Sequence, residues 1–281
     1  MLQTFELLDR FELLYPDNSQ LSDLRRAYID QDLNSIFRIV NDNNKDDLRK
    51  LILENNIWKL WPLLDLFADT QFSAAFKSFF VNNVKYDKDC FSRGQLQSKL
   101  WLVEELKKLN VDLGTVFLCA GWYGTLAVML FESGIKVEKI RSFDIDTTTV
   151  DIAETFNKPW FTDQWRYKAL INNIHDIDYK EHTWQYWSNA NSRMSYPITD
   201  TPNTVINTSC EHIENYAEWY NKIPKGKLII IQANDYHEVE EHVNTYNTIE
   251  EFSVSAPMSS TLYEGELELP KYKRFMKIGY R

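Results

Sequence analysis

The sequence predicts an α/β protein in which a mostly parallel, doubly wound sheet follows a helical N-terminal region. From residue 114 onward, short apolar runs alternate with segments of helical periodicity, which is the order that builds parallel sheets. Before that point, apolar residues recur at helical spacing and no strand-like alternation occurs. We therefore divide the chain into a helical region, 1–94, and an α/β domain, 95–281.

The N-terminal region has the pattern of a bundle of short helices. Leu2, Phe5 and Leu8 recur at helical spacing, and similar apolar segments follow up to residue 84. The segment 95–109 predicts one more amphipathic helix, directly before the first strand. The simplest interpretation is a bundle that covers one face or edge of the next domain.

After the helix 95–109, the α/β domain is expected to contain five strands and four further helices, and then an antiparallel C-terminal pair. The expected strands are 115–120, 137–146, 167–174, 204–209 and 227–233. The expected helices are 125–134, 147–157, 211–223 and 237–247. The segments 250–258 and 271–280 are expected to pair, and 176–203 to form a long loop. The sheet would then be mostly parallel with an antiparallel C-terminal strand.

The composition limits the classes of function. The chain carries 31 basic and 41 acidic residues, a net charge of −10, whereas general nucleic-acid binders need a basic surface. Its three cysteines show neither a disulfide framework nor zinc-finger spacing. Neither a secretory signal nor a membrane span is evident, so we expect a cytoplasmic protein with no membrane partner.

A turn with two glycines follows the first expected strand. Its residues are Cys119, Ala120, Gly121, Trp122, Tyr123 and Gly124. A turn between a strand and a helix is where nucleotide ligands bind in such sheets. Gly121 lets the backbone approach a ligand without an intervening Cβ, and Gly124 allows close helix–strand packing. The turn is therefore expected to bind a nucleotide-type cofactor.

Polar residues also end the next two expected strands. Asp144 ends the second strand, where a carboxylate can accept both hydroxyl hydrogens of an adenosine ribose, and Ile145 adjoins it. Asn173 ends the third strand, where its amide can hydrogen-bond an adenine amino group, next to Ile174. The alternative for Asn173 is that it simply begins a turn.

The CAGWYGT turn, the FDID segment and the NNI segment together resemble the class I S-adenosylmethionine (SAM) dependent methyltransferases, over about residues 95–281. The resemblance implies a Rossmann-like fold, SAM as the cofactor and a one-carbon transferase activity. Phe117 and Cys119 stand where that family has an acidic residue and its first glycine, which removes the usual carboxylate contact to the SAM amino group. The segments SKLWLVEEL and INTSCEHI also resemble a phage-encoded group of methyltransferase-like proteins.

The end of the fourth expected strand carries the candidate chemistry. Asn207, Glu211 and His212 should lie near the reacting methyl group, because strand carboxyl ends face the ligand crevice. His212 can act as a general base, or it can pack in the cleft wall while Glu211 meets a helix N-terminus. Cys210 is expected to be a structural thiol rather than a nucleophile. The NTSC segment lacks the prolines of the tetrad that DNA amino methyltransferases carry here.

Two further features bear on ligand binding. Trp184, Trp187 and Arg193 lie in the long loop 176–203, where they can stack on a planar or cationic acceptor or simply pin the loop. In the resembling fold, the helix that carries Lys99 borders the methionine end of SAM. Lys99 can therefore pair with the SAM carboxylate or lie on the surface.

No metal is expected from the spacing of the histidines. His237 and His242 are five residues apart, whereas the HExxH zinc motif places its histidines four apart on one helical face. The acidic residues around them predict a solvated helix face instead.

These features predict a SAM-dependent methyltransferase that acts on a small-molecule or protein acceptor, with nucleic acid as a less favoured acceptor. One alternative is a protein that binds SAM or a nucleoside without turnover, as a regulatory or structural subunit. Another is an enzyme that uses SAM for cleavage or aminocarboxypropyl transfer. A dinucleotide enzyme is a distant alternative, because the turn lacks three glycines in the usual spacing.

Overall fold

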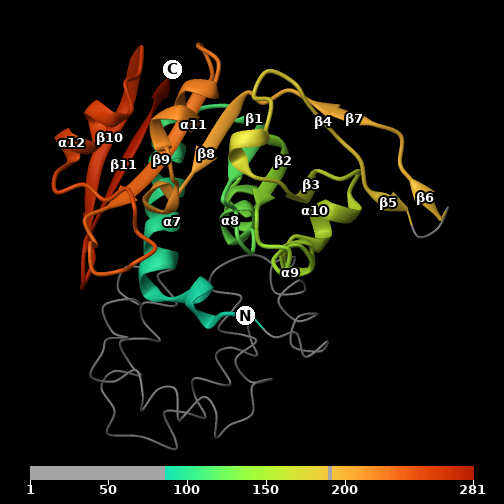
Figure 1. The fold of residues 1–281 in the computed structure, drawn as a ribbon, viewed down its shortest axis with the longest axis horizontal. Helices are drawn as coiled ribbons and strands as arrows, with labels where there is room; N and C mark the ends of the chain where they lie inside the picture. Colours follow the sequence, from blue (N-terminus) through green and yellow to red (C-terminus); the bar gives the residue numbers. More distant parts are fainter. Residues whose placement is uncertain (1–85, 189–191) are drawn as a thin grey trace, which may run out of the picture. The chain divides into compact units, whose positions relative to one another are not determined.

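The computed structural model describes residues 86–188 and 192–281 of the chain (Figure 1). The expected helical region, 1–94, therefore lies outside the described residues except for its last nine. Within the described part, a seven-stranded sheet has the order β10-β11-β9-β8-β1-β2-β3. Its strands are β1 Gly114–Cys119, β2 Val137–Asp144, β3 Tyr167–Ile171, β8 Thr204–Asn207, β9 Leu228–Asn234, β10 Ser260–Glu268 and β11 Lys273–Tyr280.

The sheet is parallel except at β11, which runs antiparallel to both β9 and β10. The change of winding direction falls at β1, which pairs with β2 on one side and with β8 on the other. This is the topological switch point at which open α/β sheets bind ligands. The expected fold class, a mostly parallel Rossmann-like sheet with an antiparallel C-terminal strand, is confirmed.

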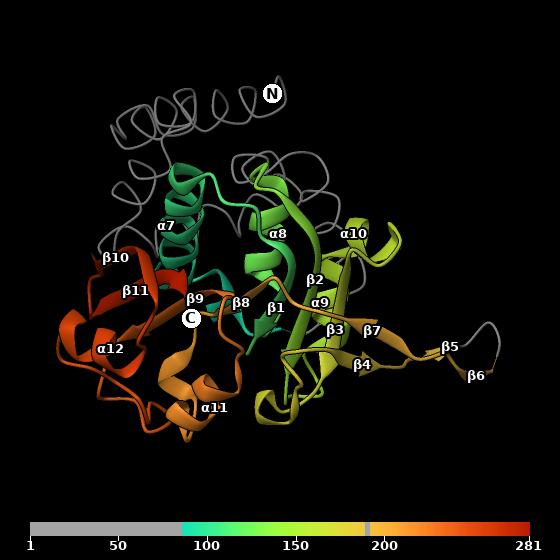
Figure 2. The same ribbon diagram turned by 90° about the horizontal axis from the view of Figure 1, so that it is seen from above.

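Helices cover both faces of this sheet. They are α7 Arg93–Leu109, α8 Thr125–Glu132, α9 Val150–Phe156, α10 Lys158–Thr162, α11 Tyr216–Lys222 and α12 Ile249–Ser255. Among residues 86–188 and 192–281, three 3₁₀ turns accompany them, η2 Lys88–Phe91, η3 Ile174–Asp176 and η4 Cys210–His212. Figure 2 shows α7 and α8 on one face of the sheet and α11 and α12 on the other. The doubly wound arrangement predicted from the βα alternation is therefore present.

The core lies between the sheet and the two helical layers. Every residue of β9 is buried, as the run of aliphatic residues in this strand requires for a central position. Phe117 of β1 packs edge-to-face on Phe143 of β2, with ring centroids 5.1 Å apart. Phe117 thus contributes to the apolar core at the position where the resembling family has an acid.

Two sequence predictions in the C-terminal part are wrong. The strand that pairs with β11 is β10, and the segment expected to be that strand instead contains α12. Thr248 explains the helix, because its hydroxyl accepts a hydrogen bond from Glu251 N and so caps the helix N-terminus. The expected helix 237–247 is a series of turns with no helical segment.

The expected long loop between β3 and β8 contains, in its described part, four short strands that form a ribbon. Its strands are β4 His182–Trp184, β5 Trp187–Ser188, β6 Arg193–Met194 and β7 Ile198–Asp200, which pair as β4 with β7 and β5 with β6. Both views show the ribbon extending beyond the β3 edge of the sheet, with β5 and β6 at its far end (Figures 1 and 2).

A buried ion pair anchors the base of this ribbon. Arg141 Nε of β2 lies 2.6 Å from Asp200 Oδ2, and the Trp184 indole donates to the same oxygen at 2.8 Å. Lys139 Nζ lies 3.1 Å from Asp200 Oδ1. Burial raises the pKa of Asp200, but the hydrogen bonds from Arg141, Trp184 and Lys139 outweigh it and lower that pKa overall.

Candidate functional site

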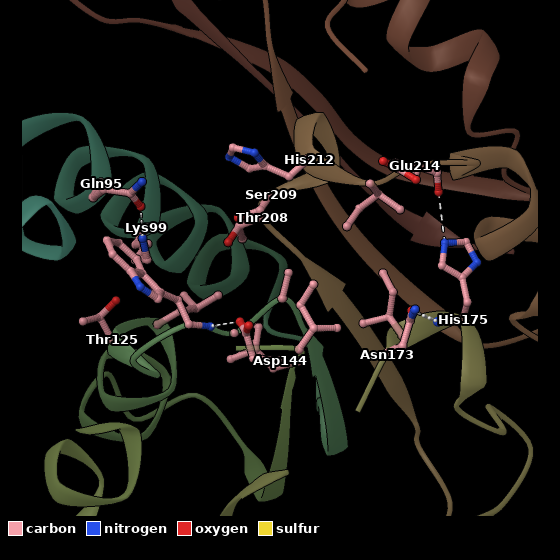
Figure 3. A pocket seen from close by; sticks show the side chains of 18 of the residues that line it. Gln95, Lys99, Thr125, Asp144, Asn173, His175, Thr208, Ser209, His212 and Glu214 are labelled. Carbon is pink, nitrogen blue, oxygen red and sulfur yellow. Dashed lines mark hydrogen bonds between the residues drawn. The ribbon is translucent and has the colours of Figure 1, made fainter. Parts of the chain in front are cut away.

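A cavity of about 850 Å³ opens at the carboxyl ends of β1, β2, β3 and β8. This volume lies in the range of small-molecule and cofactor sites, about 300–1,000 Å³. Figure 3 shows Lys99 and Gln95 at one end of the cavity, Asn173 and His175 at the other, and Asp144 between them. The lining residues thus come from segments that are far apart in the sequence and that the switch point brings together.

The turn after β1 forms one wall of the cavity through Ala120, Gly121 and Trp122. Ala120 and Trp122 have φ values of 51° and 47°, in the left-handed region that residues with a side chain rarely adopt. The turn is held by Gly121 N, which donates to Phe143 O at 3.0 Å, and by Trp122 N, which donates to Asp144 Oδ2 at 2.8 Å. Backbone strain therefore persists at this wall because β2 fixes the turn.

The two glycines of the turn allow close packing. A Cβ added at Gly121 would collide with Ser142 Oγ of β2. Gly124 has φ +67°, and a Cβ there would collide with the Tyr167 hydroxyl and lie 2.6 Å from Asn157 Nδ2. Gly121 also lines the cavity, whereas Gly124 does not and acts through the helix–strand packing expected of it.

Asp144 lines the middle of the cavity with its carboxylate fixed in place. Its Oδ2 accepts from Trp122 N, and its Oδ1 accepts from Asp146 N at 3.0 Å. Each carboxylate oxygen accepts more than one hydrogen bond, so both retain capacity for a ligand. Ile145 beside it also lines the cavity and is 70% exposed.

Asn173 and Ile174 line the far end of the cavity. Asn173 Oδ1 accepts from His175 N at 2.9 Å, so this side chain caps η3, as the structural alternative expected. Its amide NH₂ has no protein partner among the described residues. His175, which the sequence did not single out, is held by a contact of 3.0 Å between Nε2 and Glu214 O.

Lys99 of α7 is buried at the near end of the cavity, not on the surface. Its ammonium donates to Gln95 Oε1. Burial and the nearby Arg274 lower the pKa of Lys99 to about 7. An anionic group placed beside this side chain would favour its charged form.

The cavity wall is acidic apart from Lys99. Its charged lining residues are Asp89, Lys99, Asp144, Glu214 and Glu218, together with the imidazoles of His175 and His212. Such a wall favours a ligand that carries both a positive centre and a carboxylate.

The residues after β8 fall into two groups. His212, Thr208 and Ser209 line the cavity. Asn207 and Glu211 are buried and do not line it. Asn207 instead accepts from Ser209 N at 2.8 Å, and its Nδ2 has no hydrogen-bond partner.

Glu211 and Cys210 are both buried, and their contacts are with other residues of the core. Glu211 Oε1 accepts from Arg274 Nη2 at 3.0 Å and from Asn234 Nδ2 at 2.8 Å. This buried ion pair, rather than a helix N-terminus, compensates its charge. Cys210 is fully buried and its pKa is raised well above the usual value by burial, so it is a protonated structural thiol, as expected.

The structure does not bring the aromatic loop residues to the cavity. Trp184 is buried at the base of the ribbon, where it stacks with Arg141 at 5.2 Å and binds Asp200. Trp187 and Arg193 are exposed at the far end of the ribbon. The ribbon leaves the sheet at the β3 edge because Asp200 is tied to β2, which directs these side chains away from the crevice.

Cys119 and Tyr123 of the turn also lie outside the cavity lining. Cys119 Sγ lies 3.4 Å from the Tyr179 hydroxyl, and burial raises the pKa of Cys119 to about 12. The Tyr123 hydroxyl accepts from Asp87 N at 3.2 Å. The two side chains therefore support the turn from behind.

Several lining residues carried no sequence signal. Asp89 and Gln95 come from η2 and α7, and Glu214 and Glu218 from the segment after η4. Isolated polar residues in helical segments resemble any solvated helix face, so no sequence spacing identifies them.

No family model and no curated protein matches the chain, so the narrower resemblance to a phage-encoded group has no support. Among solved structures, the chain is similar to the N-methyltransferase NodS from Bradyrhizobium japonicum WM9 in complex with S-adenosyl-L-homocysteine. The identity is 6%, the match covers 73% of this chain and 98% of that chain, and the TM-score is 0.49.

Two further solved structures are similar at the same level. Magnesium protoporphyrin IX methyltransferase (ChlM) from Synechocystis PCC 6803, with bound SAM, has 12% identity over 78% of this chain and 95% of that chain, with a TM-score of 0.46. The small RNA methyltransferase HEN1 has 14% identity over 70% of this chain and 26% of that chain, with a TM-score of 0.49. Identities this low establish neither activity nor acceptor.

Proposed function

We propose that this protein is a SAM-dependent methyltransferase with a small-molecule or protein acceptor. One observation carries the proposal: Lys99, Asp144 and Asn173 follow one another along a single cavity at the switch point of the sheet (Figure 3). Their chemistry matches, in the same order, the carboxylate, the ribose hydroxyls and the adenine of SAM.

The residues present fit this cofactor. Asp144 keeps acceptor capacity on both oxygens while backbone amides hold it in place. Lys99 is a buried side chain with a lowered pKa and an amide partner, and no carboxylate of the described residues lies within ion-pair distance of it. The acidic wall suits a sulfonium. Bound in the cavity, SAM would supply an electrophilic methyl group.

Asp89 offers a replacement for the acid that the turn lacks. Phe117 is buried in the core and cannot contact a ligand amino group. Asp89 lines the same cavity, and its charge favours the ammonium form of Lys99. We therefore assign Asp89 the carboxylate contact to the SAM amino group.

The acceptor would meet His212, Thr208 and Ser209 at the cavity wall. His212 Nδ1 lies 3.2 Å from Glu241 O, and a carbonyl can only accept, so Nδ1 carries a proton and Nε2 is free to accept one. His212 is accordingly the candidate general base. Trp187 and Arg193 remain candidates for binding an acceptor larger than the cavity.

The test is calorimetric titration of the full chain with SAM and with S-adenosylhomocysteine, using NAD as the control ligand. Micromolar binding of SAM and S-adenosylhomocysteine, without binding of NAD, would support the proposal. No binding of SAM or S-adenosylhomocysteine would overturn it.

A second assay separates turnover from binding. Incubation with acceptor pools should release S-adenosylhomocysteine if methyl transfer occurs. Release of methylthioadenosine would instead indicate aminocarboxypropyl transfer or cleavage, and SAM affinity without either product would indicate a binding protein.

A further inference from the structure

Glu211, His212 and His242 come together beside the cavity although the sequence separates His242 from the other two. One ligand atom from each residue lies within 4.8 Å of the other two. The two imidazole rings are edge-to-face, with centroids 4.7 Å apart. Two imidazoles and a carboxylate form a donor set that first-row transition metals prefer.

Both histidines have the hydrogen bond that metal-ligating histidines usually show. His212 Nδ1 lies 3.2 Å from Glu241 O, and His242 Nδ1 lies 2.7 Å from Tyr236 O. Since carbonyl oxygens only accept, each Nδ1 carries the proton and each Nε2 presents a lone pair. Such bonds fix the tautomer and orientation of a metal-binding imidazole.

Glu211 supplies an independent indication of a missing ligand. Its Oε1 is occupied by Arg274 and Asn234, whereas Oε2 is buried with no hydrogen-bond partner in the part of the chain that the structure describes. The side chain is 3% exposed, so water does not satisfy this oxygen readily. A buried carboxylate oxygen without a partner is costly, and a cation would compensate it.

The turn segment that carries His242 is tied to η4 by backbone hydrogen bonds. Val243 N and Asn244 N both donate to Glu211 O, at 2.8 Å and 3.0 Å, and Asn244 Nδ2 donates to Ile213 O. These bonds replace the internal bonds of the helix that the sequence predicted here. They hold His242 against His212 whether or not an ion is bound.

We propose that Glu211 Oε2, His212 Nε2 and His242 Nε2 bind a divalent first-row transition metal such as Zn²⁺. Ligands of a tetrahedral ion at 2.0–2.2 Å lie about 3.3–3.6 Å apart, so the ligand atoms of the three residues, which lie within 4.8 Å of one another, have to come slightly closer when an ion binds. Three protein ligands leave a fourth position open to water or to a bound molecule. The site does not require that the cavity binds SAM.

His212 also lines the cavity, so a bound ion would lie beside the wall that the proposed function assigns to the acceptor. An ion on Nε2 takes the lone pair that a general base needs. The same histidine would then act on an acceptor with oxygen donors through the ion, as a Lewis acid, rather than by accepting a proton.

The experiment is titration of metal-free full-length protein with Zn²⁺ by calorimetry and with Co²⁺ by visible absorption. We expect one ion per chain, and at least tenfold weaker binding in His212→Ala and in His242→Ala. His237→Ala is the matched control, because this exposed histidine lies on the same segment and contacts Thr245 instead. It should bind both ions as the unaltered chain does.

Three results would overturn the site: no stoichiometric binding of either ion, unchanged affinity in both alanine variants, or an equal loss in His237→Ala, which would show adventitious histidine binding. Glu211→Gln, which keeps an oxygen for Arg274, tests the carboxylate, and it too should weaken binding at least tenfold. Thermal unfolding of each variant and SAM titration in parallel separate loss of the metal site from loss of fold or of the SAM cavity.

Discussion

At the scale of single residues, Asp144 connects the local geometry of the turn with ligand binding. Its carboxylate accepts from the amide of Trp122, a residue with a left-handed backbone, and it also faces the cavity. The same side chain therefore stabilises a strained wall and offers acceptor oxygens to a ribose.

We expect Asp144→Ala to weaken SAM binding by about 100-fold or more. Each hydrogen bond to a charged group contributes about 1.5–3 kcal/mol, two such bonds to the ribose would be lost, and about 1.4 kcal/mol corresponds to a factor of ten. Calorimetric titration measures the change. Asp146→Ala is the control, because the Asp146 carboxylate is turned toward Thr148, and its SAM affinity should be unchanged. Equal affinity of Asp144→Ala and the unaltered chain would refute the ribose assignment.

Lys99 predicts a pH dependence of SAM binding. Burial, together with Arg274, lowers its pKa to about 7 in the free protein, and a SAM carboxylate would favour the ammonium form. Below this pKa the side chain is already charged and affinity is constant. Above it, binding must take up a proton, so the Kd should rise by up to about tenfold per pH unit.

Titrations from about pH 6 to about pH 9 in two buffers of different ionisation enthalpy would measure this proton uptake. Lys99→Met should bind SAM more weakly and lose the lysine contribution to the pH slope. Any slope that persists in Lys99→Met belongs to the ligand or to other groups. An identical slope in both proteins would remove Lys99 from the binding site.

At the scale of elements, the turn between β1 and α8 depends on its contact with β2. A Cβ at Gly121 would collide with Ser142 Oγ, and the neighbouring strand cannot move without breaking its parallel pairing with β1. The turn position is thus set by the spacing between two strands.

We expect Gly121→Ala to destabilise the domain by about 1–3 kcal/mol, the usual cost of overpacking a well-packed site. The loss should be smaller when the same substitution is made in a Ser142→Ala background, which removes the colliding hydroxyl. Denaturant unfolding of the unaltered chain, of each single variant and of the double variant gives the coupling free energy between positions 121 and 142. A coupling of zero would mean that the collision is not what requires glycine here.

At the scale of the whole molecule, charge limits the partners. The net charge of −10 and the acidic cavity wall oppose binding of polyanions. No helix in the described part of the chain is long and apolar enough to cross a membrane.

We therefore expect no measurable binding of a labelled DNA or RNA duplex in about 0.1 M salt, because a net charge of −10 opposes association with a polyanion. Fluorescence anisotropy measures this directly. A basic protein such as lysozyme, at the same concentration, serves as the positive control. Saturable micromolar binding by this chain would restore nucleic acid as an acceptor class.

The order of the first five strands of the main sheet could be predicted from the sequence because hydrophobic periodicity is a local property. Short apolar runs predicted the parallel strands, which have four to eight residues, and Gly121, Asp144 and Asn173 were identified because strand carboxyl ends meet at one edge of the sheet. The fold class and part of the cavity wall follow from these signals alone.

Tertiary contacts decided the rest. The segment 237–247 has a helical pattern, yet its amides donate to Glu211 O and Asn234 O, so it folds as turns and carries His242 to His212. The ion pair between Arg141 and Asp200 holds the base of the aromatic ribbon away from the cavity. Lys99 could lie on the surface by its sequence pattern, but the tertiary structure buries it at the cavity and lowers its pKa. Periodicity describes which face of a segment is buried, but hydrogen bonds and charges between distant segments decide where that face lies.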